Sequence, residues 1–248
     1  MKPNIVMFFP DQLRRDALGC YGNTVCKTPN LDRLALEGVK FENAFNTSPT
    51  CSPSRASLLT GLYPHNHGVM INTHIAPAWS QGLSPETQTF SSIMDKSGYK
   101  MNYIGKWHVN EKFGPDKFGF KRPKPSASLL KRPRGPNRPV PGTETIIDLP
   151  GGSHLIAATS TLPKESYETW LMADFGIEVI RRCAKDKKPF FLRMDMSPPH
   201  FANVVPEPYA SMYDPDKIPP WPSFDENFSE KPACHLRKHK NWNLQDKD

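Results

Sequence analysis

The sequence has no hydrophobic run that approaches the roughly 18 residues needed to span a lipid bilayer. Its first three residues lead directly into the short apolar run 5–9, which is too brief and wrongly flanked for a signal peptide. We therefore expect a cytoplasmic chain with no membrane partner. With 248 residues, of which 37% are hydrophobic, it can form one large domain or two small ones around a real core.

The sequence also lacks paired cysteines. Its five cysteines are widely scattered and form no CxxC pair, so neither a disulfide framework nor a zinc finger is indicated. Cys51 needs its own explanation because it lies among prolines and serines in the stretch TSPTCSPSRASLLTG, residues 47–61. A thiol used for packing normally lies in an apolar run, although most free cysteines, taken alone, are structural.

Acidic residues are absent from segment 121–138, which holds seven basic residues. This number equals the formal net charge of +7, so the rest of the chain is balanced. The segment contains several prolines and almost no aromatic residues, which favours a solvated loop over a surface that stacks nucleic-acid bases. We expect no specific nucleic-acid partner, and a sulfated polysaccharide is the polyanion such a segment would attract.

Apolar strand patterns alternate with amphipathic helix patterns along the chain. This order predicts an α/β fold with a mostly parallel sheet between helices. Segment 114–163 is rich in proline, glycine, lysine and serine and predicts an insertion over the sheet. No further core element is expected beyond residue 197. The expected strands are 5–9, 39–45, 99–105 and 189–197, and the expected helices are 28–38, 87–96 and 164–184.

Cys51 is predicted to lie at the amino terminus of a helix that ends at Gly61. Ser52 can cap this helix, and Pro53 suits its first turn. The positive end of the helix dipole then points at position 51, and Arg55, one turn along, adds a cation. Such a site favours a bound anion or an ionised nucleophile.

The motif CSPSR at 51–55, followed by LTG at 59–61, resembles the signature of the type I sulfatases of the alkaline phosphatase superfamily. The resemblance implies that a formylglycine-generating enzyme converts Cys51 to formylglycine, an aldehyde whose hydrate carries two hydroxyls. One hydroxyl attacks the sulfur of a sulfate monoester and expels the alcohol. The other is deprotonated and restores the aldehyde, which releases sulfate.

A divalent metal is expected beside this nucleophile, and the carboxyl end of the first strand supplies Asp11. The resemblance implies Ca²⁺, or alternatively Mg²⁺, held by Asp11, Gln12 and the group made from Cys51. Many sulfatases carry an acid where this chain has Gln12, and the pairing of Asp with Gln resembles a known subgroup. The amide oxygen can ligate calcium but brings no charge.

Two further motifs supply candidate substrate ligands. In IGKWHVN, residues 104–110, an extended backbone would direct Lys106 and His108 to the same side. The resemblance implies that Lys106 binds sulfate and that His108 assists formylglycine breakdown. It also implies that His200, in MSPPH, binds sulfate and protonates the leaving oxygen. The histidines of GLYPHNHG at 61–68 are expected to shape a loop, and Asn72 is a candidate for the pocket lining.

The same residues also have structural interpretations. Asp11 could be a turn residue after Pro10, and His200 could order a proline-rich loop. Lys106 could be a surface lysine, and His108 could be a satisfied histidine. Four segments in the order found in the family favour the functional interpretation.

The resemblance covers about residues 2–214 and matches only the front part of a sulfatase. Three features of the family have no counterpart before residue 248: the remaining metal ligands, a second lysine and the smaller C-terminal subdomain. We therefore expect the N-terminal portion of a catalytic domain, with a sheet that is incomplete at its C-terminal side. The substrate is expected to be a sulfated small molecule or saccharide. Two alternatives remain open: an inactive anion-binding fragment, and a phosphonate or phosphate ester hydrolase of the same superfamily.

Overall fold

The computed structural model describes residues 2–75, 82–132, 135–149, 152–221, 224, 226 and 228–241. The chain divides into two compact units. Unit 1 contains residues 1–132 and 168–200, and unit 2 contains residues 133–167 and 201–248. Within the described ranges, every helix is too short or too polar to traverse a bilayer.

Unit 1 is built on a sheet of three parallel strands in the order β1-β5-β2. These strands are β1 (Ile5–Pro10), β5 (Phe190–Met196) and β2 (Lys100–Gly105). All residues of the central strand β5 are buried, as expected for a strand covered on both faces. The parallel sheet predicted from the alternating strand and helix patterns is thus confirmed.

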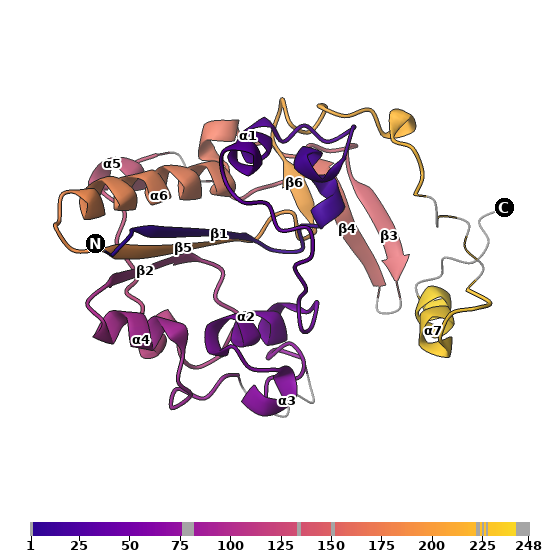
Figure 1. The fold of residues 1–248 in the computed structure, drawn as a ribbon. Helices are drawn as coiled ribbons and strands as arrows, with labels where there is room; N and C mark the ends of the chain where they lie inside the picture. The colour runs from indigo at the N-terminus through magenta and orange to yellow at the C-terminus, as the bar shows by residue number, and fades with distance from the viewer. Residues whose placement is uncertain are drawn as a thin grey trace. The chain divides into compact units, whose positions relative to one another are not determined.

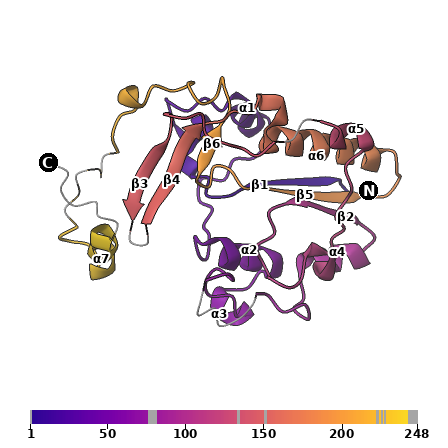
Figure 2. The same ribbon diagram turned by 180° about the vertical axis from the view of Figure 1, so that it is seen from behind.

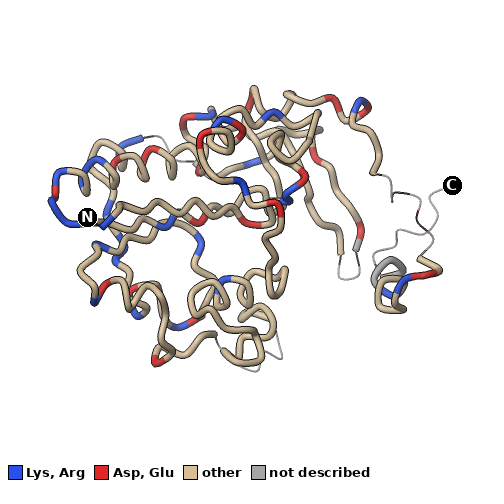
Figure 3. The backbone as a smooth tube through the Cα atoms, viewed as in Figure 1, with Lys and Arg blue, Asp and Glu red and all other residues tan. Residues whose placement is uncertain are grey.

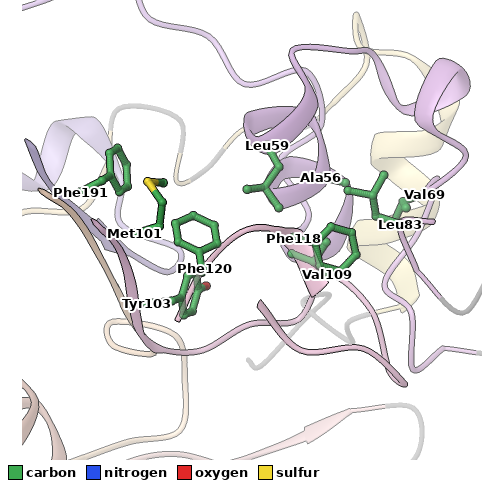
Figure 4. Close-up of a cluster of buried hydrophobic side chains, with 10 residues drawn as sticks. All are labelled: Ala56, Leu59, Val69, Leu83, Met101, Tyr103, Val109, Phe118, Phe120 and Phe191. Carbon is green, nitrogen blue, oxygen red and sulfur yellow. The ribbon is translucent and has the colours of Figure 1, made fainter. Parts of the chain in front are cut away.

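Helices cover both faces of this sheet (Figures 1 and 2). Helix α6 (Glu168–Ala184) packs on one face, where Val179 contacts the even-numbered residues of β5 such as Leu192. Helices α2 (Cys51–Thr60) and α4 (Phe90–Lys96) lie on the other face. There, Leu59 belongs to the same buried cluster as Tyr103 and Phe191 (Figure 4).

The rest of unit 1 consists of shorter elements and loops. Helix α1 (Pro29–Glu37) forms where it was predicted, but Leu34 on its apolar stripe is exposed. The prediction of a strand at 39–45 is wrong, because this segment is irregular and Val39 and Phe45 are exposed. β-Branched and aromatic residues favour a strand only where a neighbouring strand pairs with them. The other α-helices among the described residues of unit 1 are α3 (Pro64–His67) and α5 (Ala127–Leu130), and short 3₁₀ helices lie at Arg15–Ala17, Gly19–Tyr21 and Pro115–Phe118.

Unit 2 contains a second sheet with the strand order β3-β4-β6. Strands β3 (Thr145–Leu149) and β4 (Gly152–Thr159) are antiparallel, whereas β4 and β6 (Asn203–Val205) are parallel. The hairpin lies in segment 114–163, where an insertion but no strand was predicted, and β6 lies beyond residue 197, where no core element was expected. Helix α7 (Ala233–Asn241) follows.

The basic segment 121–138 is partly neutralised by acidic neighbours in unit 1. Arg122 pairs with Asp116 at 2.8 Å, and Arg132 pairs with Asp174 in α6. Lys and Arg positions occur in many parts of the chain rather than in one cluster (Figure 3). Arg134 of this segment lies outside the described residues.

Candidate active site

Three chain segments meet where the parallel strands of unit 1 end. The backbone N–H of Asp11, directly after β1, donates to the carbonyl of Met196 at 2.9 Å. The backbone N–H of Lys106, directly after β2, donates to the carbonyl of Asp195 at 2.9 Å. The carboxyl ends of parallel strands share one edge of a sheet, which is where α/β proteins bind their ligands. This edge brings Asp11, Lys106 and Asp195 together.

Gly105 permits the close approach of β2 to β5 at this edge. Its φ is +98°, and a Cβ atom there would lie 2.0 Å from the backbone oxygen of Asp195. Both facts require glycine, because L-residues disfavour this φ and no side chain fits in that space. The glycine therefore sets the position from which Lys106 enters the site.

Helix α2 presents its amino terminus to the same edge. It begins at Cys51 with Thr50 as the N-cap, so the prediction that Ser52 caps it is wrong. Ser52 is instead inside the first turn, where its N–H donates to Oδ1 of Asn72 at 3.0 Å and its Oγ accepts from the N–H of Thr73 at 3.3 Å. Asn72 thus satisfies a helix amide that has no partner within the helix.

Cys51 lies between a carboxylate and an ammonium group. Its Sγ is 3.5 Å from Oδ1 of Asp11 and 3.8 Å from Nζ of Lys106. Burial raises the pKa of the Cys51 thiol above its ordinary value, and the negative charge of Asp11 adds to this effect. An unmodified Cys51 is therefore a protonated thiol at neutral pH, not an activated thiolate nucleophile.

Asp11 is buried and receives two cationic hydrogen bonds on one oxygen. Nη2 of Arg55 donates to its Oδ2 at 2.8 Å, and Nζ of Lys106 donates to the same atom at 2.9 Å. Burial opposes ionisation of this carboxyl, but the hydrogen bonds from Lys106 and Arg55 outweigh it and lower the pKa. Oδ1 remains directed at Cys51.

Arg55 is held from the opposite side by Asp195, a residue that the sequence analysis missed. Asp195 is fully buried and accepts from Nη1 of Arg55 at 2.5 Å, from the hydroxyl of Tyr103 at 2.6 Å and from two guanidinium nitrogens of Arg193 at 2.8 Å. Arg193 and Asp195 are two residues apart in a strand, so both project to the α2 side of the sheet.

The charges of this group leave a positive excess. Three cations, Arg55, Arg193 and Lys106, face two carboxylates, Asp11 and Asp195, so the sum of formal charges is +1. The side chains of Arg55 and Arg193 are buried and anchored, whereas that of Lys106 is 21% exposed. Lys106 is therefore the cation that an incoming anion can reach.

His200 joins the group from the loop after β5. Its side chain, Asp11 and Cys51 each offer one ligand atom, and these atoms lie within 4.8 Å of one another. This trio could hold a metal ion. Gln12, also predicted as a ligand, is exposed and has a φ of +61°, an uncommon backbone conformation for a residue other than glycine.

The extended backbone predicted from Lys106 to His108 is not found. The strand ends at Gly105, and His108 has a φ of +51°, so the backbone is not extended at this residue. Its Nε2 lies 2.7 Å from Nδ1 of His74. Burial lowers the pKa of His108 to about 4, and the nearby charge of Lys106 adds to this effect. The imidazole is therefore neutral at neutral pH.

His67, in the loop after α2, supports that helix from behind. Its Nδ1 accepts from the N–H of Val69 at 3.2 Å, so its Nε2 carries the proton and donates to Oγ of Ser57 at 2.9 Å. The prediction that this loop has a structural role agrees with the contact. His65 is exposed and stacks on Tyr63 with a centroid distance of 5.8 Å.

Comparisons with known proteins agree with this arrangement. The family model named Sulfatase matches residues 3–238. The chain is 31% identical over 241 residues to an ulvan-active sulfatase of Formosa agariphila, a match that covers 95% of this chain and 43% of that protein. It is 41% identical over 111 residues to a steryl-sulfatase of Rattus norvegicus, which covers 43% of this chain and 19% of that protein.

A solved structure, the phosphonate monoester hydrolase of Agrobacterium radiobacter, superposes with a TM-score of 0.65 and 25% identity. The alignment covers 89% of this chain and 45% of that protein. The chain thus spans less than half the length of these relatives. The family match covers nearly all of the chain, the sheet is of the expected α/β type, and the signature cysteine lies at the strand ends. This chain belongs to the sulfatase family.

Proposed function

We propose that this chain supplies the nucleophile and the anion-binding cations of a sulfuric ester hydrolase that cleaves sulfate monoesters. One observation carries the proposal: Sγ of Cys51 lies 3.5 Å from the Asp11 carboxylate and 3.8 Å from the Lys106 ammonium, within a group whose formal charges sum to +1. A sulfate monoester carries one negative charge, and the positive excess attracts it.

Formylglycine made from Cys51 supplies a hydrated aldehyde, which provides both the attacking hydroxyl and the hydroxyl whose deprotonation releases sulfate. The residues around it bind and orient the ester. Lys106 donates to a sulfate oxygen, and the buried Arg55 holds Asp11 in place through a hydrogen bond to its Oδ2. His200 protonates the oxygen of the departing alcohol, and His108 in its neutral form accepts the proton of the second hydroxyl.

A divalent cation, Ca²⁺ or alternatively Mg²⁺, is part of the proposal. Oδ1 of Asp11 and the group at position 51 would be its ligands, and the cation would polarise a hydroxyl or a sulfate oxygen. The donors in the described residues do not amount to a calcium site, because Asp11, position 51 and His200 offer three mixed ligand atoms. Calcium takes about six to eight oxygens.

The proposed substrate is a sulfated saccharide or a sulfated small molecule. The relative that matches 95% of this chain is active on ulvan, and the other relative is a steryl-sulfatase. We favour the saccharide because the match to the ulvan-active sulfatase includes unit 2. The match to the steryl-sulfatase covers only 43% of the chain.

A second candidate reaction is hydrolysis of phosphonate monoesters. The structural likeness to a phosphonate monoester hydrolase favours it. A phosphonate monoester is also a tetrahedral anion with one negative charge, so the charge excess alone does not discriminate against it. Comparison of kcat/KM on an aryl sulfate and on the matched aryl phosphonate tests which anion is preferred.

The decisive experiment is a turnover assay with an aryl sulfate and calcium, on the full chain coexpressed with a formylglycine-generating enzyme. We expect sulfate release that is abolished in Cys51→Ala and retained in Cys234→Ala, since Cys234 lies in α7 and is exposed. Equal release from both variants would refute the role of position 51. Sulfate binding without turnover would instead support the anion-binding alternative.

A further inference from the structure

A second group of potential metal ligands lies outside the Asp11 and Cys51 site. His74, His108 and Glu111 each offer one ligand atom, and these atoms lie within 4.8 Å of one another. His74 and Glu111 are exposed and His108 is half-buried, so an ion in solution can reach the group. The proposed reaction uses His108 but neither His74 nor Glu111, so an ion bound here would take His108 out of that reaction.

The first ligand, His74, comes from a segment that is fixed to the start of α2. The N–H of Thr73 donates to Oγ of Ser52 at 3.3 Å, and Asn72 accepts from the N–H of Ser52 at 3.0 Å. Thr73 is itself buried. The residues immediately before His74 are therefore held by a helix of the core, so the imidazole starts from a defined position.

The other two ligands come from a segment held by separate contacts. Val109, between them, is fully buried, and its carbonyl accepts from the N–H of Leu83 at 3.0 Å. The hydroxyl of Thr73 donates to Oε1 of Glu111, so a neighbour of the first ligand orients the carboxylate of the third. Hydrogen bonds of this kind orient metal ligands and raise their affinity.

We propose that His74, His108 and Glu111 form a binding site for a transition-metal ion of the Zn²⁺ type, separate from the group of Asp11, Cys51 and His200. Two imidazoles and one carboxylate are a donor set suited to zinc and its neighbours, whereas calcium prefers oxygen alone. Three protein ligands leave the fourth position of a tetrahedral zinc ion to water.

The two imidazoles need only a small adjustment to bind such an ion. Nδ1 of His74 and Nε2 of His108 are 2.7 Å apart, which is a hydrogen bond between the two rings. Two nitrogens that bind one tetrahedral zinc ion at about 2.0–2.1 Å are about 3.3 Å apart. The rings, which are stacked with a centroid distance of 4.8 Å, must therefore separate by about 0.6 Å.

The test is a titration of the metal-free full chain with Co²⁺ in the presence of excess Ca²⁺. Visible absorption reports the bound cobalt, and Zn²⁺ is then added to compete with it. Absorption of cobalt bound to nitrogen and oxygen differs from that of cobalt bound to thiolates, so binding by the five cysteines is recognised separately. We expect one cobalt ion per chain that zinc displaces and calcium does not. No such ion would overturn the proposal.

Two variants localise the site. His74→Ala and Glu111→Gln are each expected to weaken cobalt binding by about 100-fold or more, since loss of a residue that only hydrogen-bonds to a metal ligand already costs about 10- to 100-fold. His65→Ala, another exposed histidine of unit 1, is the matched control and is expected to bind as the unaltered chain does. Unchanged affinity in both His74→Ala and Glu111→Gln would overturn the proposal. The readout does not depend on turnover, so it stands or fails separately from the proposed reaction.

Discussion

Asp195→Asn removes the charge that holds two buried guanidinium groups, and the structure predicts a large loss of stability for it. The Asp195 carboxylate is fully buried and accepts hydrogen bonds from Arg55, Arg193 and Tyr103. Asparagine has nearly the same shape but directs either a neutral oxygen or an NH₂ group at these donors. Arg193 then loses the carboxylate that accepts its two hydrogen bonds.

Removal of one partner from a buried ion pair typically costs about 3–5 kcal/mol, because the remaining charge stays buried. For a chain of this size, 1 kcal/mol corresponds to about 2–4 °C in melting temperature. We therefore expect Asp195→Asn to lower the midpoint of thermal unfolding by about 6–20 °C.

The assay is thermal and urea unfolding of the full chain, with Asp186→Asn as the matched control. Asp186 pairs with Lys100 at an exposed position, where an ion pair is worth about 0–1 kcal/mol. If Asp195→Asn destabilises the chain no more than Asp186→Asn, Asp195 is not the anchor of the site and our description of the charged group is wrong.

Three further predictions concern the site itself. Lys106→Met is expected to weaken binding of inorganic sulfate by about 10- to 100-fold in calorimetry, because a hydrogen bond to a charged group is lost; unchanged affinity would exclude Lys106 from the anion site. Asp11→Asn is expected to lower the pKa of the unmodified Cys51 thiol and to speed its alkylation by iodoacetamide at neutral pH, because the cations then act unopposed; slower alkylation would contradict this. Gly105→Ala is expected to destabilise the chain in urea by more than Gly98→Ala, because both glycines have positive φ but only the first would clash with backbone; equal losses would refute the close approach.

The convergence of Asp11, Lys106 and Cys51 could be predicted from the sequence for a physical reason. Two of these residues directly follow strands of the parallel sheet, and the carboxyl ends of parallel strands share one edge of a sheet. The proline and serine residues after Cys51 indicated a helix start, although the cap is Thr50 and not Ser52. The family signature then identified what the residues at this edge could do.

Asp195 was missed although the sequence carries a signal for it. The strand FFLRMDM is apolar except for Arg193 and Asp195, two charges of opposite sign at a spacing that places both on one face. A buried strand tolerates charge only where it is paired. What the pattern could not show is that the same carboxylate also anchors Arg55, which lies 140 residues earlier.

The failed predictions share a dependence on tertiary context. The period of two that linked Lys106 to His108 holds only while the strand continues, and β2 ends at Gly105. The strand expected at 39–45 had suitable propensities, but in the described structure no neighbouring strand pairs with it. The link between His74 and His108 joins two loops, and no local pattern reports such a contact.

The measurement that tests the central claim most directly is mass spectrometry of the peptide that spans residues 47–61, from the full chain coexpressed with a formylglycine-generating enzyme. The account predicts that position 51 has lost its sulfur and carries an aldehyde, which a hydrazine reagent traps as a hydrazone. An intact cysteine thiol at position 51 in all recovered peptide would contradict it.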